Sequence, residues 1–318
     1  MPHTPPSLNR RHLLQTGLGA AAWAATAGVP ALAASPGTPD LSKVTLRVGT
    51  YKGLWRALIA ASGQGNTPYR IEWRELNNGV LHIEALNGDA LDLGSGSEIP
   101  ALFAARQKAQ VRFIAVVRED LNNQVTLARK DTPIQRIADL KGKRVGYVRA
   151  TTSHYYLSKQ LAEAGLSFAD ITAINLTPAD GLSAFDRGDL DAWAIYGYNG
   201  QLARLRYGAR VIKTGVGYLS GNFPIYANPR AVDDPARHAA ISDYLLRLRR
   251  AYQWANGNYL DYARAQSAET RVPVGDLIEL WNSRSTDYDL GPVDDAVVQG
   301  HQAAVSYTHL TLPTTPYV

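Results

Sequence analysis

Two alternating runs decide the fold: VTLRVG at residues 44–49 and YRIEWREL at residues 69–76. Apolar and polar residues alternate in both, which is the pattern of a half-buried strand. Between them, LWRALIAAS at residues 54–62 has apolar residues at helical spacing. A strand, a helix and a second strand in this order predict a parallel strand pair joined by a crossover helix.

The same alternation continues along the chain. Further strands are expected at 90–93, 111–117, 124–128, 144–148, 171–176, 192–195 and 209–213. Helical patterns lie between or after them, at 80–86, 99–106, 155–164, 181–186, 201–207, 241–256, 259–268, 274–282 and 293–304. A second α/β unit begins near Pro133, and the pattern is mostly helical after Pro224. The sequence therefore predicts two α/β units with largely parallel sheets, a two-lobed architecture, and a helical C-terminal region.

Residues 1–34 are expected to form an export leader and not part of the fold. Arg10 and Arg11 precede an alanine-rich apolar stretch that ends at the small-x-small sequence of residues 31–33. This pattern predicts a twin-arginine signal peptide cleaved near Ala33, and hence a periplasmic protein. An uncleaved membrane anchor is the alternative, but a stretch rich in Ala and Gly inserts weakly into a bilayer. Residues 35–43 indicate a linker.

Composition excludes several classes of protein. The chain has 318 residues, 45% of them hydrophobic, and no cysteine, so disulfides, thiolate metal sites and cysteine nucleophiles are excluded. The formal charge of +5 includes the two leader arginines and is spread without like-charge runs, so no nucleic-acid partner is expected. A weak positive field suits a small anionic ligand.

The strongest local signal for a site is Thr151-Thr152-Ser153-His154, which follows the strand at 144–148 and opens a helix. Hydroxyl groups and the free N–H groups of a helix start converge there, at the positive end of the helix dipole. Such a position can bind a sulfonate, carboxylate or phosphate group. Redundant N-capping of the helix is the alternative.

Three other segments could contribute to a cleft. The first strand ends in a glycine-flanked loop with Lys52, and Gly94-Ser95-Gly96-Ser97 follows the strand at 90–93. Glycines let backbone N–H groups approach an anion, although ordinary turns would have the same composition. Tyr196 and Tyr198 follow the strand at 192–195 and could close over a ligand, whereas Trp193 could equally lie in the core. The same two possibilities apply to Asn222, Phe223 and Tyr226.

Catalytic and cofactor motifs are missing from the sequence. The glycine run at 94–97 departs from the dinucleotide, P-loop and nucleophile-elbow spacings. The seven histidines form no His-x-x-x-His pair, and no carboxylate cluster has metal-ligand spacing. We therefore expect no enzyme, no metal and no cofactor.

From residue 44 to 304 the chain resembles the periplasmic substrate-binding proteins of ABC importers for aliphatic sulfonates, taurine and nitrate. The resemblance is carried by ordered segments, at residues 46–49, 52–53, 84–87, 91–95, 99–103, 139–143, 153–155, 176–180, 184–188 and 191–195. It implies the type II fold of these proteins, in which two lobes joined by two crossover strands close on a ligand. Residues 44–128 and 227–305 would form lobe 1, and residues 129–226 would contain the crossovers and lobe 2. The two crossover strands themselves would lie near residues 124–133 and 222–229.

The resemblance also implies the function and the site. The function would be delivery of an organic anion, above all an aliphatic sulfonate, to a membrane permease with its ATPase, by a monomeric receptor. Taurine, nitrate or an aromatic sulfonate is an alternative ligand, and an enzyme of the same fold or a sensor is an alternative role. The expected ligand-binding residues are Lys52, Ser95, Gly96, Ser97, Thr151, Thr152, Ser153, His154, Tyr196 and Asn222.

The chain departs from the family pattern at several places. Tyr196-Gly197-Tyr198-Asn199 replaces Trp-Asp-Pro-Tyr at a strand end that would face the ligand. The added aromatic ring at Tyr198 suggests a bulkier or aromatic ligand. Residues 306–318 have neither charge nor helical period, and we expect this tail to be foreign sequence or unstructured.

Overall fold

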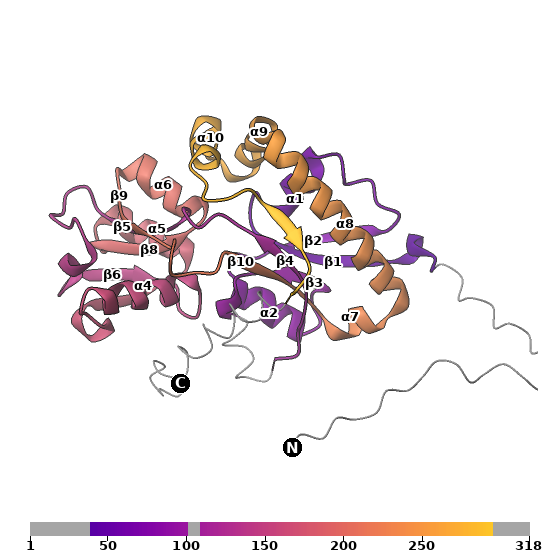
Figure 1. The fold of residues 1–318 in the computed structure, drawn as a ribbon, viewed down its shortest axis with the longest axis horizontal. Helices are drawn as coiled ribbons and strands as arrows, with labels where there is room; N and C mark the ends of the chain where they lie inside the picture. The colour runs from indigo at the N-terminus through magenta and orange to yellow at the C-terminus, as the bar shows by residue number, and fades with distance from the viewer. Residues whose placement is uncertain (1–38, 101–108, 295–318) are drawn as a thin grey trace, which may run out of the picture. The chain divides into compact units, whose positions relative to one another are not determined.

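The structure, a computed structural model, describes residues 39–100 and 109–294. Its first sheet has six strands in the order β11-β4-β10-β3-β1-β2 (Figure 1). The strands are β1 (Thr45–Thr50), β2 (Arg70–Glu75), β3 (Leu93–Ser95), β4 (Arg112–Arg118), β10 (Asn222–Ala227) and β11 (Asp289–Gly291).

The second sheet has five strands in the order β7-β6-β8-β5-β9. These are β5 (Gln124–Ala128), β6 (Arg144–Tyr147), β7 (Thr172–Asn175), β8 (Ala192–Tyr196) and β9 (Arg210–Thr214). The two sheets confirm the prediction of a two-unit α/β fold.

Each sheet is mixed, so the expectation of largely parallel sheets is only half right. In the first sheet β2, β1 and β3 are parallel, whereas β10 runs antiparallel to both β3 and β4. In the second sheet β7, β6 and β8 are parallel, and β5 runs antiparallel to β8 and β9. The chain crosses from the first sheet to the second between β4 and β5. It returns from the second sheet to the first between β9 and β10. The antiparallel strands β5 and β10 are therefore the strands that follow the two crossings. Sequence periodicity carries no information on strand direction.

The two crossovers therefore lie slightly earlier than expected. β5 was expected at the end of lobe 1, but it pairs wholly within the second sheet. β10 was expected to be a crossover, but it is a central strand of the first sheet. The connecting segments are residues 119–123 and 215–221, and the backbone N–H of Glu119 in one donates to the carbonyl of Gly221 in the other, at 3.0 Å.

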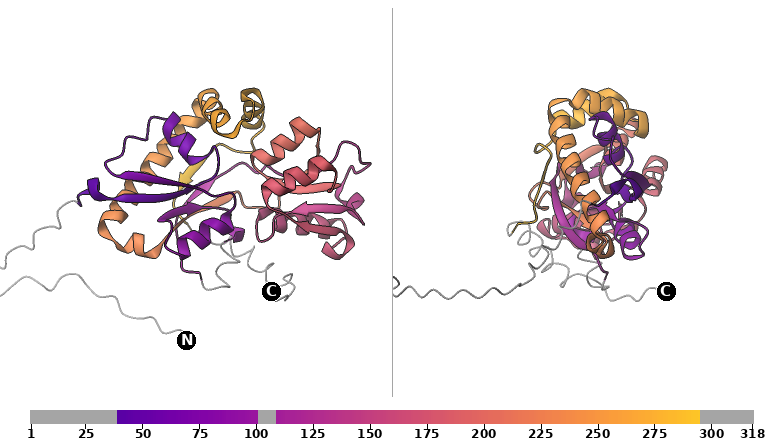
Figure 2. Two further views of the ribbon diagram at one scale, coloured as in Figure 1. Left: turned by 180° about the vertical axis from the view of Figure 1, so that it is seen from behind. Right: turned by 90° about the vertical axis from the view of Figure 1, so that its right-hand side faces the viewer.

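Helices cover both faces of the first sheet (Figures 1 and 2). α1 (Trp55–Ala61) and α8 (Pro235–Gly257) lie on one face, and α2 (Gly79–Asn87) packs on β3 and β10 from the other. The core between α8 and the strands holds Trp55, Tyr244 and Tyr252, all buried. α8 begins where Asp234 accepts from the backbone N–H of Arg237 and Pro235 occupies the first helical position.

Helices also cover both faces of the second sheet. α4 (Thr152–Glu163) packs on one face, and α5 (Pro178–Arg187) and α6 (Tyr198–Tyr207) pack on the other. Alternate residues of β8 serve the two sides: Ala192 and Ala194 face α4, whereas Trp193 and Ile195 face α5 and α6. This is the period-two alternation of a strand buried on both faces.

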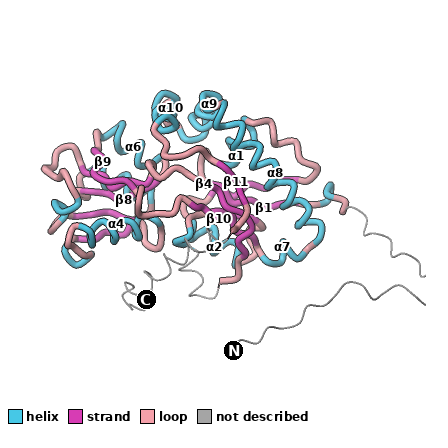
Figure 3. The backbone as a smooth tube through the Cα atoms, viewed as in Figure 1, coloured by secondary structure: helices cyan, strands magenta, loops and turns pink. Residues whose placement is uncertain are grey.

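The C-terminal part of the described chain is helical, as predicted (Figure 3). After α7 (Pro229–Asp233), the helices α8, α9 (Tyr259–Thr270) and α10 (Val274–Asn282) follow in succession. The sequence did not predict β11, which pairs antiparallel with β4. The leader, the tail at 306–318, most of the expected helix at 293–304 and part of the one at 99–106 lie outside the described residues.

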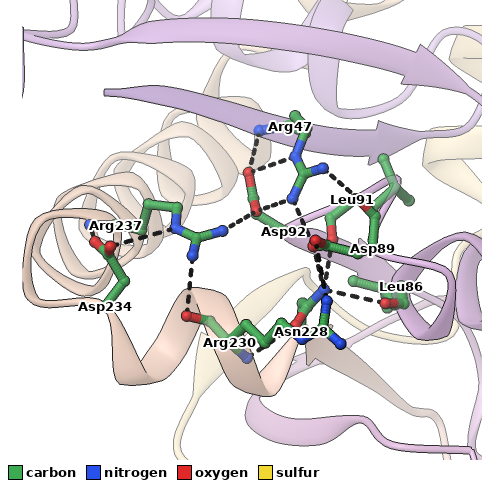
Figure 4. A network of polar contacts seen from close by, with 9 residues as sticks. All are labelled: Arg47, Leu86, Asp89, Leu91, Asp92, Asn228, Arg230, Asp234 and Arg237. Carbon is green, nitrogen blue, oxygen red and sulfur yellow. Dashed lines mark hydrogen bonds and ion pairs between the residues drawn. The ribbon is translucent and has the colours of Figure 1, made fainter. Parts of the chain in front are cut away.

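An arginine–aspartate clamp ties β1 to the segment before β3 (Figure 4). Asp92, whose side chain is fully buried, accepts from the backbone N–H of Arg47 at 2.8 Å and from its guanidinium Nη2 at 2.7 Å. Arg237 of α8 adds a second cation at 3.2 Å from Asp92 Oδ1. Around this clamp, Asn228 donates to the carbonyl of Leu86 and to the carboxylate of Asp89. The clamp therefore joins β1, α2 and α8.

The second sheet has the same clamp at the equivalent place. Asp191, just before β8, accepts from the backbone N–H of Arg144 at 2.8 Å and from its Nη2 at 2.7 Å. This pair is more open to solvent, because the side chains of Arg144 and Asp191 are 45% and 21% exposed.

Candidate functional site

A cavity of about 390 Å³ lies where loops from both sheets meet. This volume is within the range of small-molecule sites and exceeds what a single anionic head group needs. Its lining comes from the loops after β1, β3 and β8, the segment between β4 and β5, the start of α4, and helices α8 to α10. Of the predicted site residues, it brings together Lys52, Ser95, Gly96, Ser97, Thr151, Thr152 and Tyr196.

The loop at 95–97 is held rigidly on the side of the first sheet. The Tyr51 hydroxyl donates to the Ser95 carbonyl at 3.1 Å, and the Tyr226 hydroxyl donates to the Ser97 carbonyl. A Cβ on Gly96 would lie 3.1 Å from Cα of Gly79, the first residue of α2. A side chain at residue 96 would therefore require the neighbouring backbone to move by a few tenths of an ångström. The loop therefore presents backbone groups to the cavity at fixed positions.

The ring of His82 supports the same loop from behind. It stacks on Tyr51 with ring centroids 4.7 Å apart, and its Nδ1 accepts from the N–H of Ser95 at 3.2 Å. Burial lowers the pKa of His82 to about 4, so the ring is neutral at neutral pH.

The start of α4 faces the cavity from the side of the second sheet. The Thr151 hydroxyl donates to the carbonyl of Val148 at 2.7 Å, and the Thr152 hydroxyl donates to Oε1 of Gln124 at 2.7 Å. Thr151 occupies the N-cap position of this 12-residue helix, but its side chain accepts no hydrogen bond from the N–H groups of the first turn. The positive end of the helix dipole thus points at a site lined by hydroxyls.

Two polar atoms beside α4 are buried without a partner among the described residues. They are the hydroxyl of Tyr196, at the end of β8, which lies beside the Thr151 side chain without a well-formed bond to it, and Oδ1 of Asn123, in the segment before β5. Both residues line the cavity. Because buried polar groups are nearly always hydrogen-bonded in native proteins, these two atoms indicate a place where a polar ligand completes the bonding.

The remaining three predicted residues lie away from the cavity. The Ser153 hydroxyl is buried and accepts from the N–H of Val148 at 3.1 Å. His154 packs on Tyr147 and Phe168, and burial together with nearby Arg149 lowers its pKa to about 4. His154 follows Ser153 on α4, and its side chain does not line the cavity.

Asn222 is the third residue away from the cavity. It occupies the first position of β10, paired with Arg118 of β4, and its neighbour Phe223 lines the cavity instead.

Sequence reasoning missed an aromatic wall formed by Tyr252, Tyr262, Trp281 and Tyr288. The rings contact one another: Trp281 lies 5.5 Å from Tyr262 and 5.1 Å from Tyr288, centroid to centroid, and Tyr252 stacks on Tyr288 at 5.8 Å. Helical spacing predicted the helices that carry the first three. It could not show that the rings turn toward a site whose loops lie in an earlier part of the chain.

Sequence reasoning also missed Glu119, which lines the cavity from the segment between β4 and β5. Burial, reinforced by neighbouring Asp120, raises the pKa of Glu119 to about 8. The available signal was a carboxylate at the end of the buried strand predicted at 111–117, where ligands of α/β folds bind.

The described residues contain no group of three or more metal-ligating side chains. Within the same residues, no helix has the length and apolar character needed to cross a membrane.

Comparison with known proteins places this cavity in context. An aliphatic sulfonates-binding protein of Escherichia coli (strain K12) is 35% identical over 212 residues, which cover 65% of this chain and 66% of that protein. The chain thus spans just under two thirds of that relative. The solved alkanesulfonate-binding protein of Xanthomonas axonopodis pv. citri, bound to MOPS, matches with a TM-score of 0.76 and 27% identity over 85% of this chain and 94% of that chain.

A more distant match is a desulfurization enzyme, with a TM-score of 0.57 and 16% identity over 84% of this chain and 92% of that chain. At that identity the similarity shows a shared fold alone. The model of the NMT1/THI5-like family matches residues 71–233, more than half of the chain, from β2 through α7. Because this match spans strands of both sheets and several segments that line the cavity, the chain belongs to the NMT1/THI5-like family.

Proposed function

We propose that this protein is the substrate-binding component of an ABC import system for an organic anion, most specifically an aliphatic sulfonate. One arrangement carries the proposal: the start of α4 and the loop at 95–97 face one cavity, beside the unpartnered hydroxyl of Tyr196. N–H groups at a helix start and the hydroxyl of Tyr196 can donate to the acceptor oxygens of a sulfonate. The ligands named for the two similar binding proteins agree with this chemistry.

The proposal includes a route and partners. The leader at 1–34, with Arg10 and Arg11, directs the chain through the twin-arginine route to the periplasm, with cleavage near Ala33. The monomeric protein binds its ligand in the cavity and delivers it to a membrane permease and its ATPase. It is a receptor and not an enzyme. Two features support this role: a chain without cysteine has no thiol nucleophile, and the cavity holds no recognisable catalytic constellation among its described residues.

The test is thermal unfolding of the mature chain with a panel of anions. The panel contains alkanesulfonates, taurine, an arylsulfonate, nitrate and sulfate. A ligand at a hundredfold excess over its Kd stabilises by about 2.7 kcal/mol, which is a shift of several degrees. Thr152→Val removes one hydroxyl at the helix start and should weaken sulfonate binding about tenfold.

Thr177→Val is the matched control. Thr177 also begins a helix of the second sheet, where it caps α5 by accepting from the N–H of Asp180, and it lies outside the cavity. This variant should lower stability without changing affinity. If no anion stabilises a cooperatively folded protein, or if both variants weaken binding equally, the proposed function is wrong.

A further inference from the structure

A helix pair joins the two sheets outside the crossing segments at 119–123 and 215–221. α6 packs on β5 and β8 of the second sheet, whereas α10 packs on α9, which contacts α1 and α8 on the first sheet. The helices α6 and α10 nevertheless lie side by side (Figures 1 and 2). Both helices line the cavity, and so does the crossing segment at 119–123. The cavity is therefore bounded by a contact between two helices as well as by the covalent crossings.

The contact between α6 and α10 has an apolar centre. Leu202 of α6 and Leu277 of α10 are buried in one cluster with Ala263 and Val272, which come from α9 and the segment after it. If α6 and α10 separated, Leu202 and Leu277 would lose their shared cluster and meet water. The hydrophobic effect therefore favours the closed arrangement, in which α6 lies on α10, even when no ligand is bound.

Polar bonds accompany the apolar centre. The buried side chain of Gln201 donates from Nε2 to the carbonyl of Asp276 at 3.2 Å. Its Oε1 accepts from Arg204 at 3.0 Å, and Arg204 forms an ion pair with Glu279 at 3.2 Å. The two side chains of this pair are 36% and 59% exposed, so the pair contributes little energy by itself. Because these bonds have to form together, they define one position of α6 on α10.

Leu202, Arg204 and Glu279 do not line the cavity, whereas Tyr198 and Leu277 belong both to the lining and to the contact. We propose that the α6–α10 contact is a latch that closes the cavity without ligand, and that Leu202, Arg204 and Glu279 are positioning residues that set the affinity. Since only the closed arrangement completes the site, affinity falls in proportion to the closed fraction of the empty protein. This inference goes beyond the proposed function, because it concerns the empty protein and holds for any ligand of the cavity.

The first measurement is made on the mature chain without ligand. The chain has no cysteine, so Asp186→Cys on α5 and Asn282→Cys at the end of α10 provide two unique, exposed sites for spin labels. Pulsed electron spin resonance then measures the distance between the two sides of the cavity. We expect two distances in the empty protein, of which the shorter is the single distance found with saturating 1-propanesulfonate.

The latch variant combines Leu202→Ala with Arg204→Gln. It removes part of the apolar centre and the ion pair, and should lower the ratio of the shorter to the longer distance about tenfold. Isothermal titration should show binding of 1-propanesulfonate weakened roughly fivefold to tenfold, and stopped-flow measurements should show faster dissociation. Saturating ligand should restore the shorter distance, which shows that the variant is folded and can still close.

The matched control combines Leu205→Ala with Arg206→Gln on the same helix. Leu205 and Arg206 are both exposed, and Leu205 lies outside the apolar cluster. Within the described part of the chain, Arg206 has no acidic partner. The control therefore makes the same two chemical changes on α6 without touching the latch, and it should leave the distances and the affinity unchanged.

The inference is overturned if the distances in the empty protein do not respond to the latch variant, or respond equally to the control. Lower stability in urea with unchanged distances would identify a permanent packing contact and would also overturn it, while the proposed function stayed intact. Failure of every sulfonate to bind would contradict the proposed function. The response of the empty protein to the latch variant would still decide this inference.

Discussion

The two arginine–aspartate clamps make the same contacts but differ in burial. They therefore allow a prediction of how much burial contributes to the stability that each clamp provides. Asp92 and Asp191 each accept three hydrogen bonds from one arginine with nearly identical distances. Asp92 is fully buried and is shared by Arg47 and Arg237, whose side chains are 26% and 28% exposed. Replacing either aspartate with asparagine keeps the shape, removes the charge and turns one N–H donor toward a guanidinium.

The cost of the change should differ between the two sites. At Asp92, two partly buried guanidinium groups lose their counter-charge, and removal of one partner of a buried ion pair costs about 3–5 kcal/mol. At Asp191, water can reach Arg144, which is 45% exposed, so the cost should be about 1–2 kcal/mol. For a chain of this length, Asp92→Asn should lower Tm by roughly 6–20 °C and Asp191→Asn by a few degrees.

The assay is urea and thermal unfolding followed by circular dichroism, with Asp186→Asn as the control. Asp186 lies on the exposed side of α5 and has no ion pair with the described residues, so its variant should be within about 0.5 kcal/mol of the parent. If Asp92→Asn and Asp191→Asn lower stability by the same amount, burial does not set the strength of these clamps and the reasoning is refuted.

Three further predictions concern stability, the loop and pH. Tyr156→Phe removes a buried hydroxyl that lies 2.9 Å from each of two strand carbonyls and can donate its one proton to either of them. The change should cost about 1 kcal/mol in urea unfolding, and a neutral result would mean that the bond contributes nothing to stability. Gly96→Ala places a methyl group against Gly79 and should weaken ligand binding in titration calorimetry about tenfold or more, whereas unchanged affinity would show that the loop can move. The pKa values of His82 and His154 are both lowered to about 4 in the folded protein. As the pH falls below about 6.5, the histidines of the unfolded chain therefore bind protons before those of the folded protein do. The free energy of unfolding should fall between about pH 6.5 and pH 4, by roughly 2–3 kcal/mol per histidine at pH 4.5. Unfolding measured against pH should give a shallower slope for His154→Gln, and an unchanged slope would contradict the assignment.

Local patterns predicted the fold where the signal is local. The alternation at 44–49 and 69–76 correctly predicted β1 and β2, and Thr177, Pro178 and Gly188 mark both ends of α5 as N-cap, first position and left-handed C-cap. The direction and partners of β5 and β10 were not predictable, because they depend on a strand passing from one sheet to the other.

The candidate site, like the fold, has parts that local sequence patterns predicted and parts that they did not. Motifs at strand ends identified the loop at 95–97 and the start of α4, because glycines and hydroxyls there have a local meaning. Ser153 and His154 carried the same local signal but turn into the protein, since neighbouring positions on a helix point about 100° apart. Glu119 and the aromatic wall come together only through tertiary packing, so residue type alone could not connect them.

The strand order of the two sheets also constrains how the chain matures as it is synthesised. All five strands of the second sheet lie within one stretch, from Gln124 to Thr214, so this sheet can be completed as soon as that stretch has left the ribosome. The first sheet cannot, because β10 at 222–227 must fit between β3 and β4, which were made more than a hundred residues earlier. Until then β3 and β4 both present open edges, and open strand edges are templates for misassociation. The growing chain is therefore most vulnerable to aggregation while the second sheet is being made.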